Sequence, residues 1–195
     1  QPWIIAFWHH PPYTKGSHNS DTESQLVEMR KNAVPIFEAA GVDLVLTGHS
    51  HSYERSFLVH GAYDTPTTAA GHIVDAGDGR ESGKGVYRKG VGAPEGAVYA
   101  VAGSSGKTSG GALNHPLMFV SLNVLGSMVL DVNDQRLDAF FLDNAGTRRD
   151  SFTILKSTTG PPPPPPPAPP QPPAQVATPT ITPAGGSFTD WVTVT

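Results

Sequence analysis

Hydrophobic positions in the first 50 residues predict two buried strands with a helix between them. Residues 3–8, WIIAFW, are a continuous apolar run rich in β-branched and aromatic side chains, which predicts a strand buried on both faces of a sheet. Residues 42–47, VDLVLT, predict a second buried strand. Between them, side chains with apolar bodies recur at helical spacing: Leu26, Val27, Arg30, Val34, Phe37 and Ala40.

Local signals predict where this helix begins, breaks and ends. Ser20 and Glu23 have the spacing of a capping box, so the helix is predicted to start there. Pro35 is predicted to kink or split it. Gly41 then supplies a left-handed stop.

A strand, a helix and a strand in this order predict a right-handed crossover with parallel strands. In open α/β sheets, ligands bind outside the carboxyl ends of the strands. His9 and the segment 48–51 follow the two predicted strands. We therefore expect them at one edge of the sheet, although they are 40 positions apart.

The second half of the chain predicts mostly strands. Residues 55–96 are Gly-rich and predict loops with short hairpin-like pieces near 62–73 and 83–92. Later strands are predicted at 97–102, 118–124, 127–132, 136–142 and 150–155. Short turns separate the last of them, which indicates an antiparallel meander with Leu137, Ala139 and Phe141 facing the core. The predicted fold class is α/β.

Proline is distributed unevenly, and this predicts the domain organisation. Of the 20 prolines in 195 residues, 11 lie in residues 161–173. We expect a domain at 1–157, an extended Pro-rich linker at 158–175, and the start of a truncated β-sandwich module at 176–195. A spacer is favoured over an SH3-binding motif because flanking basic residues are missing. Without an initiator Met or a charged leader, the chain is interpreted as a piece of a longer protein.

Composition excludes several functions. A formal net charge of -4 and a pI near 6.0 lack the basic excess of a nucleic-acid-binding protein. The longest apolar run, residues 3–8, is too short to span a membrane. Because the chain has no cysteine, any bound metal must use histidine, carboxylate, amide or water ligands.

Histidines are the strongest candidates for chemistry. Five of the eight precede Ser52. In extended backbone, His49 and His51 project to the same side, which permits two ligands to one metal or one ligand to each of two metals. The adjacent His9 and His10 project in opposite directions, so one of them faces the edge, and the spacing leaves open which one.

Other polar residues have simpler explanations. His60, His72 and His115 have no ligand-like neighbours and predict surface or hairpin roles. Asp75 and Asp78, in VDAGDG, form a carboxylate pair that turn chemistry explains equally well.

Two segments carry a resemblance to a known family. AFWHHPPY at residues 6–13 and GHSHSYERS at 48–56, with NSDTESQLVEMR and VDLVLT between them, resemble the C-terminal half of a calcineurin-like metallophosphoesterase of the purple acid phosphatase-like branch. The resemblance covers residues 1–157. It implies part of a four-layer α/β/β/α sandwich, with a centre of two divalent or trivalent metal ions (Fe, Zn or Mn) between the sheets.

The resemblance also implies roles for individual residues. His9 matches the histidine of a His-x-Pro element, which binds the second metal. His49 and His51 match the ligands of a Gly-His-x-His signature, one for each metal. His18 resembles an outer-sphere histidine that binds substrate phosphate or protonates the leaving alkoxide. Residues 53–55, Tyr-Glu-Arg, are expected to support the signature loop.

The expected activity is metal-dependent hydrolysis of phosphoric esters, chiefly phosphomonoesters. The family's remaining ligands lie in upstream motifs that this chain lacks, so the fragment alone is expected to be inactive. The alternatives are a phosphodiesterase or nucleotidase on the same fold, and a non-catalytic surface protein that presents the C-terminal module. Metallo-β-lactamase and amidohydrolase types are disfavoured, since the former has Asp-His where this chain has Ser52 and Tyr53.

Location is inferred from the C-terminal residues. A proline rod followed by TPTITPAGGSFTDWVTVT resembles the start of a chitobiase C-terminal or fibronectin-like module, as in exported bacterial enzymes. Secretion is therefore expected, with carbohydrate or a cell surface as the partner of that module.

Overall fold

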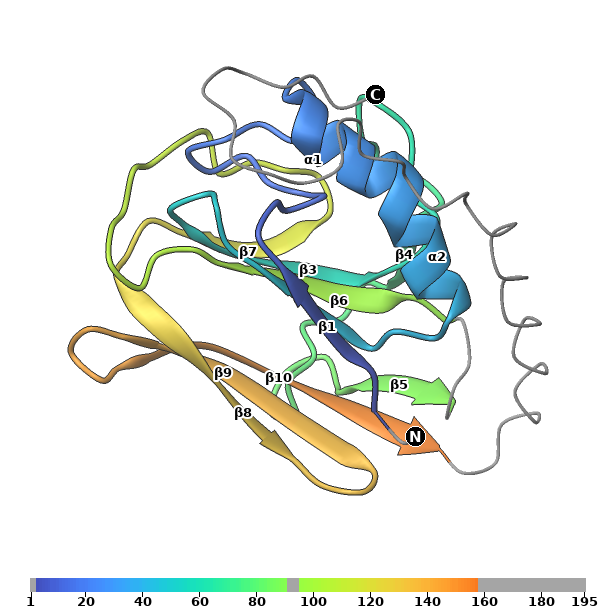
Figure 1. Ribbon diagram of the computed structural model, residues 1–195. Helices are drawn as coiled ribbons and strands as arrows, with labels where there is room; N and C mark the ends of the chain where they lie inside the picture. The colour runs from blue at the N-terminus through green and yellow to red at the C-terminus, as the bar shows by residue number, and fades with distance from the viewer. Residues whose placement is uncertain (1–2, 91–94, 158–195) are drawn as a thin grey trace, which may run out of the picture. The chain divides into compact units, whose positions relative to one another are not determined.

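Two β-sheets face each other, and one broken helix covers the outer face of the larger sheet (Figure 1). The computed structural model describes residues 3–90 and 95–157, so the predicted linker at 158–175 and module at 176–195 lie outside it. The helical segments are α1 (Ser24–Glu28), the π-helical turn η1 (Met29–Ala33) and α2 (Val34–Ala39). None of the described helices is long and apolar enough to cross a membrane.

The larger sheet has the strand order β1-β2-β6-β3-β4, with β7 also paired to β3. Its strands are β1 (Ile5–Trp8), β2 (Leu44–Thr47), β3 (Tyr53–Val59), β4 (Ile73–Asp75), β6 (Ala97–Ala102) and β7 (Met118–Leu122). The smaller sheet has the order β5-β10-β9-β8. Its strands are β5 (Tyr87–Gly90), β8 (Gly126–Val132), β9 (Arg136–Asp143) and β10 (Arg148–Ser157).

The predicted parallel pair is confirmed. β1 runs parallel to β2, with Trp8 opposite Thr47, and β2 runs parallel to β6. Both strands therefore end at the same level, and the residues that follow them, His9 and Gly48, meet there. The backbone N–H of Gly48 donates to the carbonyl of His9 at 3.1 Å.

The prediction that β1 is buried on both faces was wrong for Phe7, whose side chain is 82% exposed. Among the described residues, β1 is an edge strand of the larger sheet, so no strand covers its outer side beside Phe7. Trp8, on the opposite face, stacks on Phe37 of α2 with ring centroids 4.9 Å apart.

The capping prediction was also wrong, for a local reason. α1 starts at Ser24, and its N-cap Glu23 makes no capping hydrogen bond. Ser20 instead accepts from the Thr14 backbone N–H at 3.0 Å, and Glu23 accepts from that of Asn19 at 2.8 Å. The polar residues thus build a turn before the helix.

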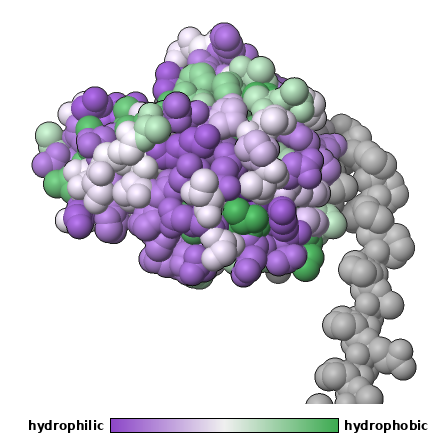
Figure 2. Space-filling model, turned by 90° about the horizontal axis from the view of Figure 1, so that it is seen from above, coloured by the Kyte–Doolittle hydropathy of each residue, from purple (hydrophilic) through white to green (hydrophobic). Residues whose placement is uncertain are grey.

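Pro35 splits the helix as predicted. The segment η1 widens the turn immediately before α2, which has the proline in its first turn. A proline has no N–H to donate, and its ring clashes with the carbonyl four residues earlier, so a wider turn relieves both problems. Figure 2 views the molecule from the helix side and shows a largely hydrophilic surface with small hydrophobic groups.

β3 was missed because its first half is polar. Tyr53, Glu54 and Arg55 begin the strand with fully buried side chains, and β3 pairs with β6, β4 and β7. The predicted antiparallel meander is confirmed for β8, β9 and β10. β7 leaves that meander and joins the larger sheet.

Two apolar clusters hold the layers together. One lies between the helix and the larger sheet and has as its buried members Tyr13, Val34, Val42, Val45, Val59, Ala62, Ala97, Tyr99 and Leu117. The other lies between the sheets and contains Leu44, Leu58, Tyr87, Val98, Leu137, Ala139, Phe152 and Ile154. Leu137, Ala139 and Phe141 are all buried, as the alternation predicted.

A buried ion pair links the sheets. Arg55 donates from Nε and Nη2 to the two Asp150 carboxylate oxygens at 2.9 Å, and Tyr53 donates its hydroxyl to the same carboxylate. Arg80 adds a bond of 2.8 Å. Burial alone would raise the pKa of Asp150, but the hydrogen bonds and charge of Arg55 and the bond from Arg80 lower it below its usual range.

We expect Asp150→Asn to reduce the free energy of unfolding by about 3–5 kcal/mol, because it leaves the Arg55 charge buried without a counter-ion. Urea denaturation of the described domain measures the loss. Glu81→Gln, which removes an exposed partner of Arg136, is the control and should change little. A small effect of Asp150→Asn would contradict the role of this pair.

The prediction of a surface or hairpin role was wrong for His115, which is buried and should make the fold sensitive to acid. It is 2% exposed, its Nδ1 accepts from the Leu117 backbone N–H, and burial lowers its pKa to about 3. In the unfolded chain, His115 binds a proton below about pH 6.5, whereas the folded residue stays neutral down to about pH 3. The free energy of unfolding therefore decreases as the pH is lowered from 6.5 to 3. In urea titrations, His115→Asn should flatten this slope by up to about 1.4 kcal/mol per pH unit. Equal slopes would refute the assignment.

Candidate metal centre

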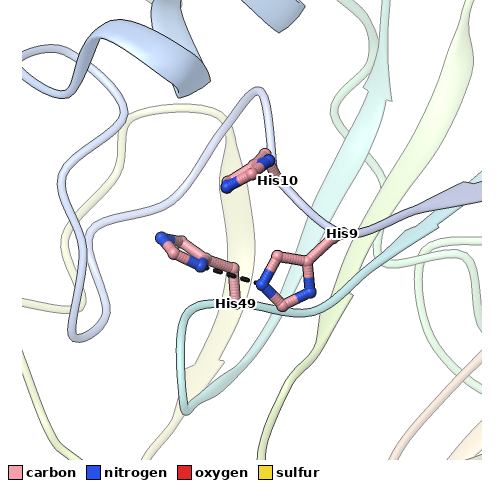
Figure 3. Close-up of side chains that lie close together, drawn as sticks. All are labelled: His9, His10 and His49. Carbon is pink, nitrogen blue, oxygen red and sulfur yellow. Dashed lines mark hydrogen bonds between the residues drawn. The ribbon is translucent and has the colours of Figure 1, made fainter. Parts of the chain in front are cut away.

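Three histidines meet where β1 and β2 end (Figure 3). His9 and His10 follow β1, and His49 lies in the loop after β2. His49 Nδ1 is 3.0 Å from His9 Nε2, and the His10 ring centroid lies 4.7 Å from that of His49. The three side chains can place one ligand nitrogen each within 4.8 Å of one another. His9 and His49 therefore lie together at one edge of the larger sheet, as predicted.

His49 owes its position to an unusual backbone conformation. Its φ of 62° lies in the left-handed region, which residues other than glycine rarely adopt. Residues 49–52 form bends and not an extended strand. The premise that His49 and His51 lie in extended backbone was therefore wrong.

His51 lies apart from the three-histidine cluster. Its Nδ1 is 3.1 Å from the Ser109 hydroxyl, and its backbone N–H donates to the Ser17 hydroxyl at 2.9 Å. The described residues contain two groups of side chains that could hold a metal ion, and His51 belongs to neither of them.

The other side of His49 faces His18 and Glu23. The His18 and His49 ring centroids are 3.9 Å apart, and His18 Nδ1 lies 2.7 Å from Glu23 Oε2. The same carboxylate oxygen is 4.0 Å from His49 Nε2. The two nitrogens of His49 thus serve two groups, one with His9 and His10 and one with His18 and Glu23.

The electrostatics suit metal binding. Burial lowers the pKa of His49, and the neighbouring His18, His10 and His9 lower it further, which favours the neutral ring. Neutral imidazole is the form that binds metal ions. Burial opposes ionisation of Glu23, but the hydrogen bonds from Asn19 and His18 hold its pKa below the usual range.

The donor set fits a transition-metal ion. Imidazole nitrogens suit Zn and Fe, and a carboxylate adds an oxygen donor. His9 Nε2 and His49 Nδ1, 3.0 Å apart, lie close enough that both would reach one ion. These donors would form part of a coordination sphere.

Two residues beside His49, His10 and Glu23, were not predicted as site residues from the sequence. The resemblance favoured His9 over His10, whereas both rings reach His49. Glu23 was assigned to helix capping, and only its spacing of five residues from His18 could have indicated a pairing. The turn explanation for Asp75 and Asp78 is supported, since each accepts a hydrogen bond from the N–H two residues later.

Comparison with known proteins finds similarity in the part of the chain that carries these histidines. Residues 1–53 match the family model of calcineurin-like phosphoesterases. These matched residues include His9, His10, His18, His49 and His51. Purple acid phosphatase 18 of Arabidopsis thaliana is 34% identical over 89 residues, which are 45% of this chain and 19% of that protein. The uncharacterized protein Rv2577 of Mycobacterium tuberculosis is 32% identical over 65 residues, 33% of this chain and 12% of that protein.

Solved structures support the fold. Purple acid phosphatase PPD1 from yellow lupin (Lupinus luteus) seeds has a TM-score of 0.61 at 17% identity, over 81% of this chain and 26% of that chain. GAP50 of Plasmodium has a TM-score of 0.52 at 13% identity, over 79% and 36%. The mixed α/β fold is thus similar to that of purple acid phosphatases. The chain spans about a fifth or less of the curated relatives that it matches.

We predict that the chain binds Zn²⁺ through the three-histidine cluster. His49→Ala should abolish binding in isothermal titration calorimetry, because His49 belongs to both ligand groups. His72→Ala should leave the affinity unchanged, because His72 belongs to neither group and has no role in the proposed centre. Unchanged Zn²⁺ stoichiometry in His49→Ala would contradict the assignment.

Proposed function

We propose that this chain is part of a metal-dependent phosphoric ester hydrolase, most simply a phosphomonoesterase. The observation that carries the proposal is the convergence of His9, His10 and His49 at the ends of two parallel strands. The match of residues 1–53 to the calcineurin-like phosphoesterase family model supports the same chemistry.

The proposed centre holds two ions. His9 would bind one of them, and His49 and His51 would contribute one ligand to each. When bound, such ions neutralise phosphoryl oxygens and lower the pKa of a coordinated water. His9, His49 and His51 do not complete two coordination spheres, so further donors outside the described residues are required. The chain alone is therefore proposed to be inactive.

His18 is proposed to act on the substrate. Its Nδ1 is engaged by Glu23 Oε2 at 2.7 Å, which leaves Nε2 to bind a phosphate oxygen or to protonate the leaving alkoxide. Its ring lies against His49, so a phosphate bound beside His49 would be within its reach.

Two alternatives use the same residues differently. A phosphodiesterase or nucleotidase would share the metal ligands and differ in its loops. A non-catalytic surface protein would keep the fold and lack a complete centre. Secretion and a role for residues 176–195 in binding carbohydrate or a cell surface remain part of the proposal.

The decisive assay compares the chain alone with the chain joined to the polypeptide that precedes it in its parent protein. With p-nitrophenyl phosphate and Fe, Mn or Zn, the joined form should turn over and the chain alone should not. His18→Ala should lower kcat by about 10²-fold or more, whereas the matched control His72→Ala should not. Faster hydrolysis of bis(p-nitrophenyl) phosphate would favour the diesterase. No turnover with any of the metals would overturn the proposal.

A further inference from the structure

A buried polar network joins the loop that carries His18 to the loop that carries His49 and His51. Thr14, Ser50, Ser52 and Glu54 are its members, and all have fully buried side chains. Glu54 Oε2 accepts from the hydroxyls of Thr14 and Ser52, the latter at 3.1 Å. Its other oxygen, Oε1, accepts from the Lys15 backbone N–H at 3.1 Å. One carboxylate therefore bonds to both loops.

The two loops touch directly beside this carboxylate. A Cβ at Gly16 would lie 2.1 Å from the Ser52 hydroxyl oxygen and 2.4 Å from that of Ser50, so no side chain fits there. Next to it, Ser17 accepts from the His51 backbone N–H at 2.9 Å. The Thr14 hydroxyl also lies 2.9 Å from that of Ser50. The contact thus covers both loops just before His18 and around His49.

Glu54 itself is rigidly placed. It is the second residue of β3, which pairs with β6 on one side and β7 on the other at this position. Its chain neighbours Tyr53 and Arg55 are tied to Asp150 by hydrogen bonds. A fixed strand therefore holds the two loops through one side chain.

We propose that Glu54 is a positioning residue that fixes the His18 ring against the His49 ring by clamping residues 14–17 to residues 50–52. It acts through these loops, since its own side-chain hydrogen bonds reach Thr14, Lys15 and Ser52. That this pairing serves catalysis rests on the proposed function, whereas the clamp itself does not. A glutamine can preserve the link, since its carbonyl can accept from Lys15 and its amide can donate to the two hydroxyl oxygens.

The test uses the 195-residue chain and three variants. Glu54→Ala removes the clamp, and Glu54→Gln is the conservative rescue. Glu38→Ala is the matched control, because Glu38 is also a buried carboxylate that accepts three hydrogen bonds, from Gly61, Tyr63 and Tyr99. Thr14→Val is a milder second disruption if Glu54→Ala does not fold.

Two measurements report on the clamp. The first is amide hydrogen exchange at Lys15 and His51, whose N–H groups donate to Glu54 and to Ser17 where the two loops meet. The second is the NOE between the ring protons of His18 and His49, whose centroids are 3.9 Å apart. Glu54→Ala should speed both exchange rates at least about tenfold, equivalent to about 1.4 kcal/mol of lost protection, and abolish the NOE. Glu54→Gln and Glu38→Ala should keep the NOE, and their amide exchange should stay as slow as in the unmodified chain.

An NOE that survives in Glu54→Ala, or that is lost equally in Glu38→Ala, would overturn the proposal. Neither measurement needs metal or turnover. A failed phosphatase assay with the clamp signature intact would reject the proposed function alone. A catalytically active protein without the signature would reject the clamp alone.

Discussion

The parallel pairing of β1 with β2 is the constraint on which the site depends. With Trp8 opposite Thr47, both strands end at one level, and the two histidine-bearing segments must leave the sheet side by side. Hydrogen bonding between Gly48 and His9 continues the contact one residue beyond the strands. The helix between the strands is what makes a parallel pair possible, because such a connection needs a crossover. The chemistry at the edge therefore follows from topology before any side chain is placed.

Buried charged residues of β3 connect the two sheets to each other and to the loops of the site. β3 carries Glu54 and Arg55 in adjacent positions, and adjacent residues of a strand point to opposite faces. Arg55 and Asp150 tie the larger sheet to the smaller one, while Glu54 bonds to the loops of the histidine edge. Each charge is costly to bury alone and is compensated by several hydrogen bonds. The strand thus couples the packing of the sandwich to the geometry of the site.

This dual use of β3 explains which parts of the molecule the sequence predicts. Apolar runs and helical periodicity located β1, β2 and the split at Pro35, because burial there is hydrophobic and local. The same criteria assigned Tyr53, Glu54 and Arg55 to a loop, because their partners Asp150 and Thr14 are distant in sequence. Pairwise compensation over such separations leaves no periodic signal. For the same reason Glu23 resembled a helix cap, although it accepts from Asn19 and lies beside His18.

The histidine edge shows why spacing alone could not order its members. Spacing placed His49 and His51 on one side because it assumed extended backbone, whereas a left-handed φ at His49 turns its ring towards His9, His10 and His18. Such a conformation costs of order 1–3 kcal/mol and persists only where the surroundings compensate for it. The contact at Gly16 and the hydroxyls bonded to Glu54 lie in the same pair of loops. The strained backbone that brings the rings together and the buried network that bonds the two loops to each other are therefore parts of one arrangement.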